Sequence, residues 1–232
     1  MLTLEALTVR AGDFALSADL SLDAPGRVAV IGPSGAGKST LLDAVAGFRT
    51  PASGRVLWNG LDITGLPPGK RPVATLFQDN NLFPHLSLDE NLALAIRPRG
   101  GRLDKSEAQR RDAALSRVGL GGFGQRRPGE VSGGQQSRAA LARVILQNRP
   151  VMLLDEPFAA LGPALKAEML SEVRRVADEM GALALIVTHD PGDARRFAER
   201  TVVVAEGRAA PARPTEELFA DPPPALRDYL GT

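Results

Sequence analysis

A glycine-rich stretch over residues 32–39 constrains the fold of this chain more than any other feature. It reads GPSGAGKS and fits the pattern G-x-x-x-x-G-K-[ST]. The apolar run RVAVIG before it predicts a buried strand, and the periodic apolar residues after it predict a helix. This order places backbone N–H groups and the positive end of a helix around phosphate oxygens. We therefore expect a loop that binds nucleotide phosphates within an α/β fold.

The residues of this loop have specific expected contacts. Lys38 is predicted to reach the β- and γ-phosphates, and the Ser39 hydroxyl is predicted to ligate Mg²⁺. Backbone N–H groups of the glycines would turn inward around the phosphates. The residues expected to line the nucleotide are Gly32, Pro33, Ser34, Gly35, Ala36, Gly37, Lys38, Ser39 and Thr40.

Two adjacent carboxylates, Asp155 and Glu156, end the apolar run VMLLDEP. Alone, such a pair would be read as the solvated end of a strand. In proteins with a phosphate loop of this type, an aspartate at the end of a second apolar strand holds Mg²⁺ together with the loop serine. We predict that Asp155 is the Mg²⁺ partner of Ser39, and that Glu156 polarises the attacking water.

Strands and helices alternate along most of the chain, which predicts a largely parallel sheet with helices on both faces. Residues 1–31 alternate as short strands and predict a small antiparallel part. Helical patterns replace strands over residues 79–148. We expect a RecA-like P-loop NTPase core from residues 1–78 and 149–232, with an inserted α-helical subdomain over residues 79–148. The C-terminal tail is expected to add about two helical turns.

Composition narrows the possible partners and chemistry. The formal net charge is +1, which gives no global electrostatic reason to bind nucleic acid. There are no cysteines, so disulfides, thiolate metal sites and cysteine nucleophiles are excluded. No stretch approaches the roughly 20 apolar residues of a membrane helix. If the protein works at a membrane, we expect it to dock onto a partner that spans it.

A second anion site is predicted at VSGGQ, residues 131–135. Ser132, Gly133 and Gly134 form a small-residue turn directly before a helix, with hydroxyl and backbone donors available to an anion. One nucleotide needs one phosphate loop, so a second cradle on the helical subdomain suggests the nucleotide of another molecule. This implies a head-to-tail dimer with two ATP molecules at its interface.

These motifs together resemble the ATP-binding cassette (ABC) transporter ATPases over nearly the whole chain. GPSGAGKST is similar to the Walker A motif, VMLLDEP to Walker B with its catalytic glutamate, and VSGGQ to the LSGGQ signature, with Val131 in place of leucine. The resemblance implies that Gln78 contacts Mg²⁺ and water and links to the permease. It also implies that His189, in VTHD, contacts the γ-phosphate. The signature residues implied to contact ATP are Ser132, Gly133, Gly134 and Gln135.

The resemblance implies an ATPase coupled to transmembrane transport, with Glu156, His189, Lys38 and Gln78 as its catalytic residues. Its cofactors would be ATP and Mg²⁺. Its partners would be a second copy of the chain, an integral-membrane permease and, indirectly, a periplasmic solute-binding protein. Its place would be the cytoplasmic face of the bacterial inner membrane.

The solute is suggested by finer similarity. Stretches such as LLDAVAGFRTPASG and EMLSEV are most similar to the ATP-binding subunits of thiamine importers. Two alternatives stay open: an importer ATPase for iron, polyamine, molybdate or sulfate, and a weakly hydrolysing nucleotide switch not tied to transport. Relatives with long coiled coils are excluded, because Gln78 and Ser132 are only 54 positions apart (132 − 78).

Contact with the permease is expected near Gln78. Leu82, Phe83 and Leu86 would supply an apolar surface, although burial inside the helical subdomain is the alternative. His85 is given no catalytic role and is expected on a loop near this contact.

Two departures from the family pattern stand out. Ala11 lies about where the family usually has an aromatic residue that stacks on adenine. Phe14 or the aliphatic part of Arg10 could substitute, adenine could be held loosely, and Phe14 could equally be plain core. Gly162 replaces the aspartate of the D-loop after Walker B, and Ala159 replaces a serine there. In relatives the D-loop crosses the dimer interface, so we expect the core chemistry to survive and coupling between the two sites to be affected.

Overall fold

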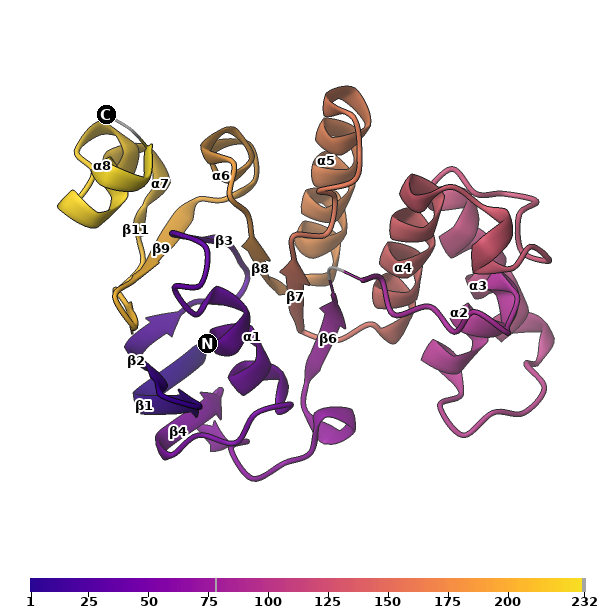
Figure 1. The fold of residues 1–232 in the computed structure, drawn as a ribbon. Helices are drawn as coiled ribbons and strands as arrows, with labels where there is room; N and C mark the ends of the chain where they lie inside the picture. The colour runs from indigo at the N-terminus through magenta and orange to yellow at the C-terminus, as the bar shows by residue number, and fades with distance from the viewer. Residues whose placement is uncertain (78, 231–232) are drawn as a thin grey trace.

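The computed structural model describes residues 1–77 and 79–230. Its strands form one 11-stranded sheet that joins a parallel and an antiparallel part (Figure 1). The parallel part has the strand order β9-β3-β8-β7-β6. These strands are β3 (Gly26–Ile31), β6 (Val73–Leu76), β7 (Val151–Asp155), β8 (Leu183–Val187) and β9 (Arg200–Ala205). The predicted α/β class with a largely parallel core sheet is confirmed.

The antiparallel part is built mainly from the N-terminal strands, as predicted. β1 lies between β2 and β4, and Leu4 is opposite Leu20 on one side and Val56 on the other. β10 joins the two parts, because it pairs parallel with β2 and antiparallel with β9. The strands are β1 (Leu2–Ala11), β2 (Phe14–Leu22), β4 (Ser53–Trp58), β5 (Leu61–Asp62) and β10 (Arg208–Ala209), and β11 (Arg213–Pro214) pairs with β9.

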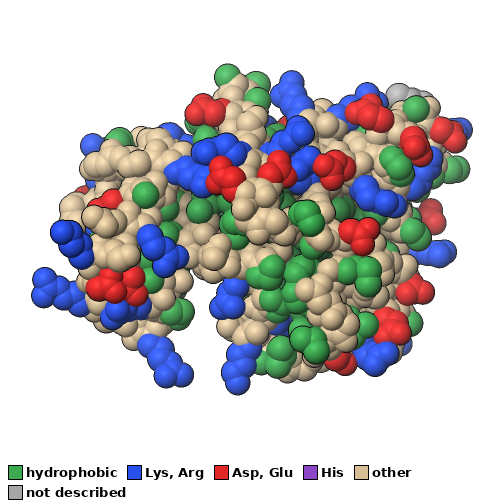
Figure 2. Space-filling model, turned by 180° about the vertical axis from the view of Figure 1, so that it is seen from behind, with side chains coloured by type: hydrophobic (Ala, Val, Ile, Leu, Met, Phe, Trp, Pro, Cys, Tyr) green, Lys and Arg blue, Asp and Glu red, His purple; other side chains and the backbone are tan. Residues whose placement is uncertain are grey.

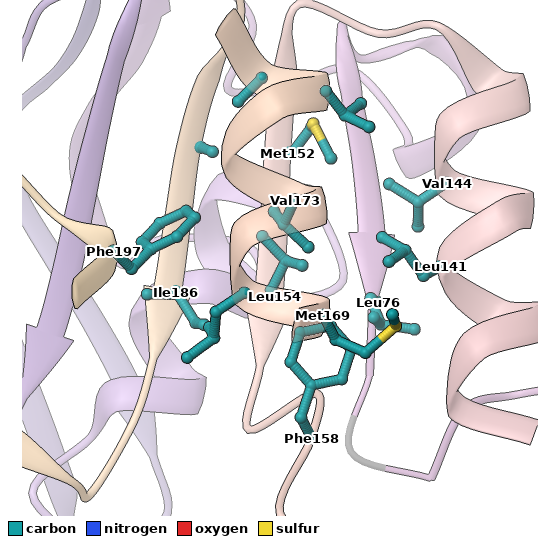
Figure 3. Close-up of a cluster of buried hydrophobic side chains, with 14 of the residues drawn as sticks. Leu76, Leu141, Val144, Met152, Leu154, Phe158, Met169, Val173, Ile186 and Phe197 are labelled. Atoms are coloured by element: carbon teal, nitrogen blue, oxygen red, sulfur yellow. The ribbon is translucent and has the colours of Figure 1, made fainter. Parts of the chain in front are cut away.

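The parallel strands are buried on both faces, which explains their unbroken apolar runs. On one face, Leu153 of β7 shares an apolar cluster with Leu41 and Val45 of α1 (Lys38–Ala46). On the other face, Met152 and Leu154 of the same strand pack in a second cluster beneath α5 (Figure 3). The helices that contribute to this second cluster include α5 (Pro163–Met180), α6 (Pro191–Phe197), α7 (Thr215–Ala220) and α8 (Pro224–Leu230).

Residues 79–148 hold three helices, and no strand occurs in the described part of this range. The helices are α2 (Leu88–Ile96), α3 (Lys105–Arg117) and α4 (Gly133–Gln147). Each begins at a capping box, in which the cap side chain and the third helical residue satisfy each other's backbone N–H. Short 3₁₀ turns lie at Pro68–Lys70 and Pro128–Glu130.

The helical region shares its core with the sheet. Leu141 and Val144 of α4 belong to the same apolar cluster as Leu76 and Leu154 of the parallel strands (Figure 3). Seen from behind, a notch at the lower edge nevertheless sets this region apart from the part that carries β1 and β4 (Figure 2). The exact boundaries proposed for the subdomain, at residues 79 and 148, stay a prediction.

The C-terminal tail is larger than the two helical turns expected. It forms two short helices, α7 and α8, separated by a proline-rich link. Proline is tolerated in the first turn of a helix, and α8 begins at Pro224. Leu218 and Leu226 are almost fully buried, so both helices are held by apolar packing. None of the helices in the described chain is long and apolar enough to span a membrane.

Arg71, just before β6, anchors the helix that follows the phosphate loop. Its side chain is almost fully buried and donates hydrogen bonds to the carbonyl oxygens of Ala44 and Val45, at 2.7 and 2.8 Å. These carbonyls lie in the last turn of α1, where a cation is favoured by the helix dipole. Burial lowers the pKa of Arg71. The guanidinium thus fixes the C-terminal end of α1, and with it the helix whose first turn carries Lys38.

Candidate functional site

The predicted phosphate loop connects the end of β3 to the start of α1 (Figure 1). Gly32 has a φ of +150°, and a Cβ there would lie 1.9 Å from the backbone oxygen of Val204 in β9. Gly37, with a φ of +104°, precedes α1, and a Cβ there would lie 2.9 Å from the Phe14 ring. Only glycine permits these approaches. The rest of the loop and first turn comprises Pro33, Ser34, Gly35, Ala36 and Thr40, of which Ser34 and Gly35 are exposed.

The Lys38 side chain folds back over this loop. Its Nζ donates hydrogen bonds to the carbonyl oxygens of Gly32 and Pro33, at 2.8 and 2.9 Å. Burial lowers the pKa of Lys38, while the carboxylates of Glu156 and Asp155 raise it. The ammonium group therefore lies at the mouth of the loop, within electrostatic reach of the predicted acidic pair.

Asp155 lies at the C-terminal end of β7, where the sequence placed it. Burial raises its pKa, a hydrogen bond with the Ser39 hydroxyl lowers it, and Glu156 raises it further. Overall the pKa of Asp155 is raised, so keeping this carboxylate ionised lowers the stability of the folded protein. The influence of the Ser39 hydroxyl on this pKa places Ser39 close to Asp155, its predicted partner in holding Mg²⁺.

This donor set fits Mg²⁺. The Ser39 hydroxyl and the Asp155 carboxylate are hard oxygen donors, and Mg²⁺ is usually held by one or two protein ligands together with substrate phosphates and water. Within the described residues there is no group of three or more His, Cys, Asp or Glu side chains that could hold a metal. The hard oxygen donors of Ser39 and Asp155 suit an Mg²⁺ ion that is also bound by the phosphates of a nucleotide.

Glu156 has an unusual backbone conformation next to His189. Its φ is +44°, in the left-handed region that non-glycine residues rarely adopt, and its N–H bonds to the Val187 oxygen at 3.2 Å. Its Oε2 lies 3.4 Å from Nδ1 of His189. The Glu156 side chain is 25% exposed and that of His189 is 60% exposed. Strained backbone of this kind is concentrated at functional sites, and here it directs Glu156 toward the predicted γ-phosphate contact.

The turn that carries His189 is held by hydrogen bonds and ion pairs from two helices. The Thr188 hydroxyl donates to the Asp193 carboxylate at 3.1 Å and accepts from the Asp190 N–H at 3.1 Å. Lys166 of α5 pairs with both Asp193 and Asp190. This network fixes the backbone on either side of His189.

The second predicted anion site lies at the start of α4. Ser132 caps this helix, its Oγ accepts from the Gln135 N–H at 3.3 Å, and the Gln135 side chain accepts from the Ser132 N–H at 2.8 Å. The helix therefore begins at Gly133, two residues earlier than the sequence pattern suggested, because the capping box brings Gly133 and Gly134 into its first turn. Ser132 and Gly133 are exposed, which leaves this helix terminus open to an anion.

The structure keeps the two predicted phosphate sites apart within one chain. Lys38, Ser39, Asp155, Glu156 and His189 come together at the C-terminal ends of β3, β7 and β8. The phosphate loop follows β3, and three strands, β8, β7 and β6, separate β3 from α4 (Figure 1). The signature turn, at the start of α4, therefore lies beyond the β6 edge of the parallel sheet. Gln78, predicted to contact Mg²⁺, lies outside the described residues.

Gly162 is the N-cap residue of α5. Its φ and ψ are −65° and 157°, an extended conformation open to any residue, and a Cβ there would meet nothing within 4 Å. No side chain caps this helix, which begins at Pro163. Leu161, which precedes Gly162, packs against the signature turn. A Cβ on Gly134 of that turn would lie 2.6 Å from a Leu161 methyl group.

Ala11, where the family usually has an aromatic residue that stacks on adenine, lies next to Phe14. Ala11 and Phe14 are paired across the tight turn between β1 and β2. Phe14 is half-buried, packs against the apolar cluster of α1 and lies against Gly37. The ring is thus part of the core and also borders the phosphate loop.

Three contacts to this site have no signal in the sequence. They are made by Lys166, by Tyr229, which bonds to the His189 backbone, and by Arg143, which bonds to the loop after Gln78. Each joins segments that are far apart along the chain. Local patterns cannot reveal them, because no motif specifies the partner.

Comparison with known proteins agrees with this geometry. The family model described as ABC transporter matches residues 16–159. Similar relatives include the protein named Thiamine import ATP-binding protein ThiQ in Cereibacter sphaeroides, 62% identical, and in Ruegeria sp., 58% identical. Both are covered over 100% of this chain and of the relative. A solved ATP-binding cassette dimer in a post-hydrolysis state bound to ADP and Pi has a TM-score of 0.82 and 28% identity, covering 93% of this chain and 99% of that one. The family match and the relatives show that the chain belongs to the ABC transporter family.

Proposed function

We propose that this chain is the ATP-hydrolysing subunit of an importer that takes up thiamine through a separate permease. One observation carries the hydrolytic part: Glu156 lies 3.4 Å from His189 and directly follows Asp155, which ends β7 beside the phosphate loop. The solute is supported by the relatives named for thiamine import at 62% and 58% identity.

Each residue of the site has a role in this proposal. Lys38 and the backbone N–H groups of the loop bind the β- and γ-phosphates. Ser39 and Asp155, with Gln78, would hold Mg²⁺, whose charge would offset the negative charge of the phosphates. Glu156 accepts a proton from the attacking water, and His189 contacts the γ-phosphate.

Two copies of the chain are needed for a complete site. The signature residues Ser132, Gly133, Gly134 and Gln135 lie away from the phosphate loop of their own chain, so they are free to contact the nucleotide of a partner copy. The solved relatives that match along almost their whole length are described as dimeric. We therefore propose a homodimer with ATP bound at the interface.

This chain offers the permease a docking surface between the sheet and the helical region. A groove there is lined by Phe48, Phe77, Leu94, Pro98 and Arg149, among others. Phe48 is 54% exposed and packs edge-on against Phe77, with ring centroids 5.2 Å apart. Exposed aromatic groups of this kind are enriched in protein interfaces.

The loop after Gln78 is divided between the two predicted environments. Phe83 is exposed and stacks edge-on with His85, whereas Leu82 packs against the apolar cluster and Leu86 is half-buried. Phe83 therefore fits the proposed permease contact better than its neighbours. In this arrangement the chain works at the cytoplasmic face of the bacterial inner membrane, and a periplasmic binding protein delivers the solute to the permease.

Uptake of labelled thiamine at low external concentration tests the proposal. Deleting the gene should abolish uptake, and the wild-type gene should restore it, while Glu156→Gln should not. Unchanged thiamine uptake together with loss of another solute's uptake would reject thiamine but keep the importer. Absence of ATP turnover by the wild-type chain with its permease would reject the hydrolytic role.

A further inference from the structure

The C-terminal helix α8 reaches the turn that carries His189. The hydroxyl of Tyr229 donates a hydrogen bond to the backbone oxygen of His189 at 2.7 Å. Tyr229 is the only tyrosine in the chain. Leu226, one turn earlier, is fully buried in the apolar cluster against which the Tyr229 ring also packs. Packing of α8 therefore holds the hydroxyl in place.

This bond adds a third helix, α8, to the two that support the turn. Lys166 of α5 and Asp193 of α6 already fix it through Asp190 and Thr188. Tyr229 bonds instead to His189 itself, the residue whose side chain faces Glu156. A change in α8 would therefore act on the orientation of the imidazole more directly than on the rest of the turn.

The electrostatic surroundings show how near α8 lies to the acidic residues of the site. Burial raises the pKa of Tyr229, and the carboxylates of Glu156 and Asp190 raise it further. The phenol consequently stays protonated at neutral pH and remains a hydrogen-bond donor. The effect of the Glu156 charge on the pKa of Tyr229 indicates that the hydroxyl lies near Glu156 as well as His189.

We propose that Tyr229 is a positioning residue for ATP hydrolysis, whose hydroxyl fixes the His189 backbone so that the imidazole stays beside Glu156. The inference rests on the proposed function, because it takes His189 and Glu156 as the residues that act on the γ-phosphate. It makes the C-terminal helix part of the hydrolytic site rather than a passive tail.

Turnover by the complete transporter in proteoliposomes provides the first test. Tyr229→Phe removes the hydroxyl and keeps the ring that packs on the cluster. We expect kcat to fall about fivefold, the effect of one typical hydrogen bond, with the KM for ATP changed less than about twofold. Arg227→Gln is the matched control, because Arg227 lies on the same helix and bonds to Pro222 and Asp221 of the tail. Its kinetics should equal those of the wild type.

Proton NMR of the isolated chain tests the positioning without relying on hydrolysis. The chain has two histidines, His85 and His189, so their ring C2–H signals can be assigned with a single His85→Gln variant. At fixed pH, Tyr229→Phe should shift the His189 signal and leave the His85 signal unchanged. Arg227→Gln should move neither.

The outcomes separate this inference from the proposed function. A shifted His189 signal with a lower kcat in Tyr229→Phe supports the positioning role. An unmoved signal, an unchanged kcat, or an equal loss of kcat in Arg227→Gln overturns it, since the hydroxyl would then have no specific effect. If the wild-type complex does not hydrolyse ATP, the proposed function fails on its own, whatever the NMR spectra show.

Discussion

Nδ1 of His189 lies 3.4 Å from Oε2 of Glu156, across the ends of the neighbouring strands β8 and β7. The separation is longer than a good hydrogen bond, so the pair is close without being locked together. Glu156 is directed to this position by its left-handed backbone, and His189 by the bonded turn that carries it. The two side chains can therefore act on a group bound next to them without a large rearrangement.

Replacing Glu156 by Gln should stop turnover while leaving nucleotide binding intact. Glutamine keeps the shape of the side chain but cannot accept a proton from water, so we expect kcat to fall by about 100-fold or more. ATP should then accumulate on a closed dimer, detectable by light scattering with ATP present. Glu168→Gln, at an exposed position of α5, is the control and should hydrolyse normally. Near-normal hydrolysis by the Glu156 variant would remove this residue from the mechanism.

Asp155→Asn should stabilise the nucleotide-free protein and abolish hydrolysis. Because burial raises the folded-state pKa of Asp155, stability is lost as the pH rises from the unfolded value of about 3.8 through the folded value. The neutral amide of asparagine does not ionise and avoids this loss. We expect a higher thermal midpoint for Asp155→Asn at pH 7.5 without nucleotide, measured by calorimetry. The exposed Asp13→Asn is the comparison. A lower midpoint in Asp155→Asn would contradict the assignment.

Gly162→Asp should strengthen α5 and the coupling between the two ATP sites. An aspartate in this N-cap position can accept a hydrogen bond from the first turn, a gain of about 0.3 kcal/mol over glycine. Gly162→Ala has no such acceptor and should destabilise the protein, which makes it the control. Urea unfolding measures both changes, and the ATP dependence of turnover measures coupling through its Hill coefficient. Unchanged turnover and cooperativity in Gly162→Asp would show that the glycine is neutral for coupling.

Arg143→Gln should reduce stimulation by the permease more than basal turnover. The Arg143 guanidinium donates to the backbone oxygens of Asn81 and Asn80, at 2.6 and 3.0 Å, and so ties α4 to the loop after Gln78. Without it, movement at the permease contact would reach α4 less completely. ATPase rates with and without permease in proteoliposomes measure the difference. Arg110→Gln, exposed on α3, should keep full stimulation, and an equal loss in both variants would show that the Arg143 bond is not responsible.

Much of the fold follows from local sequence patterns. The buried strand before the phosphate loop, the helix after it and the strand that ends in Asp155 were all predicted, because each is a short, strongly patterned segment. The start of α4 was placed too late, since a capping box outweighed the low helix propensity of Gly133 and Gly134. The tail was underestimated because the prolines around position 223 interrupt its pattern, although apolar burial holds both helices.

The site was predictable where motifs specify it and unpredictable where tertiary packing does. The proximity of Ser39 to Asp155 follows from two motifs on strands of one parallel sheet. The bond from Tyr229 to His189 spans 40 positions, and that from Arg143 to Asn81 spans 62. Neither partner lies in a pattern that names the other, so only the folded chain brings them together.

The contact between Leu161 and Gly134 joins the segment after Glu156 to the first turn of α4. A Cβ at position 134 would overlap a methyl group of Leu161. The size of the residue at position 161 therefore limits which residues fit at position 134. Related chains with a small residue at position 161 should tolerate alanine or serine at position 134, whereas those with leucine should keep glycine. Packing by Leu161 of the D-loop therefore restricts the second glycine of the signature, apart from the phosphate contact predicted for it.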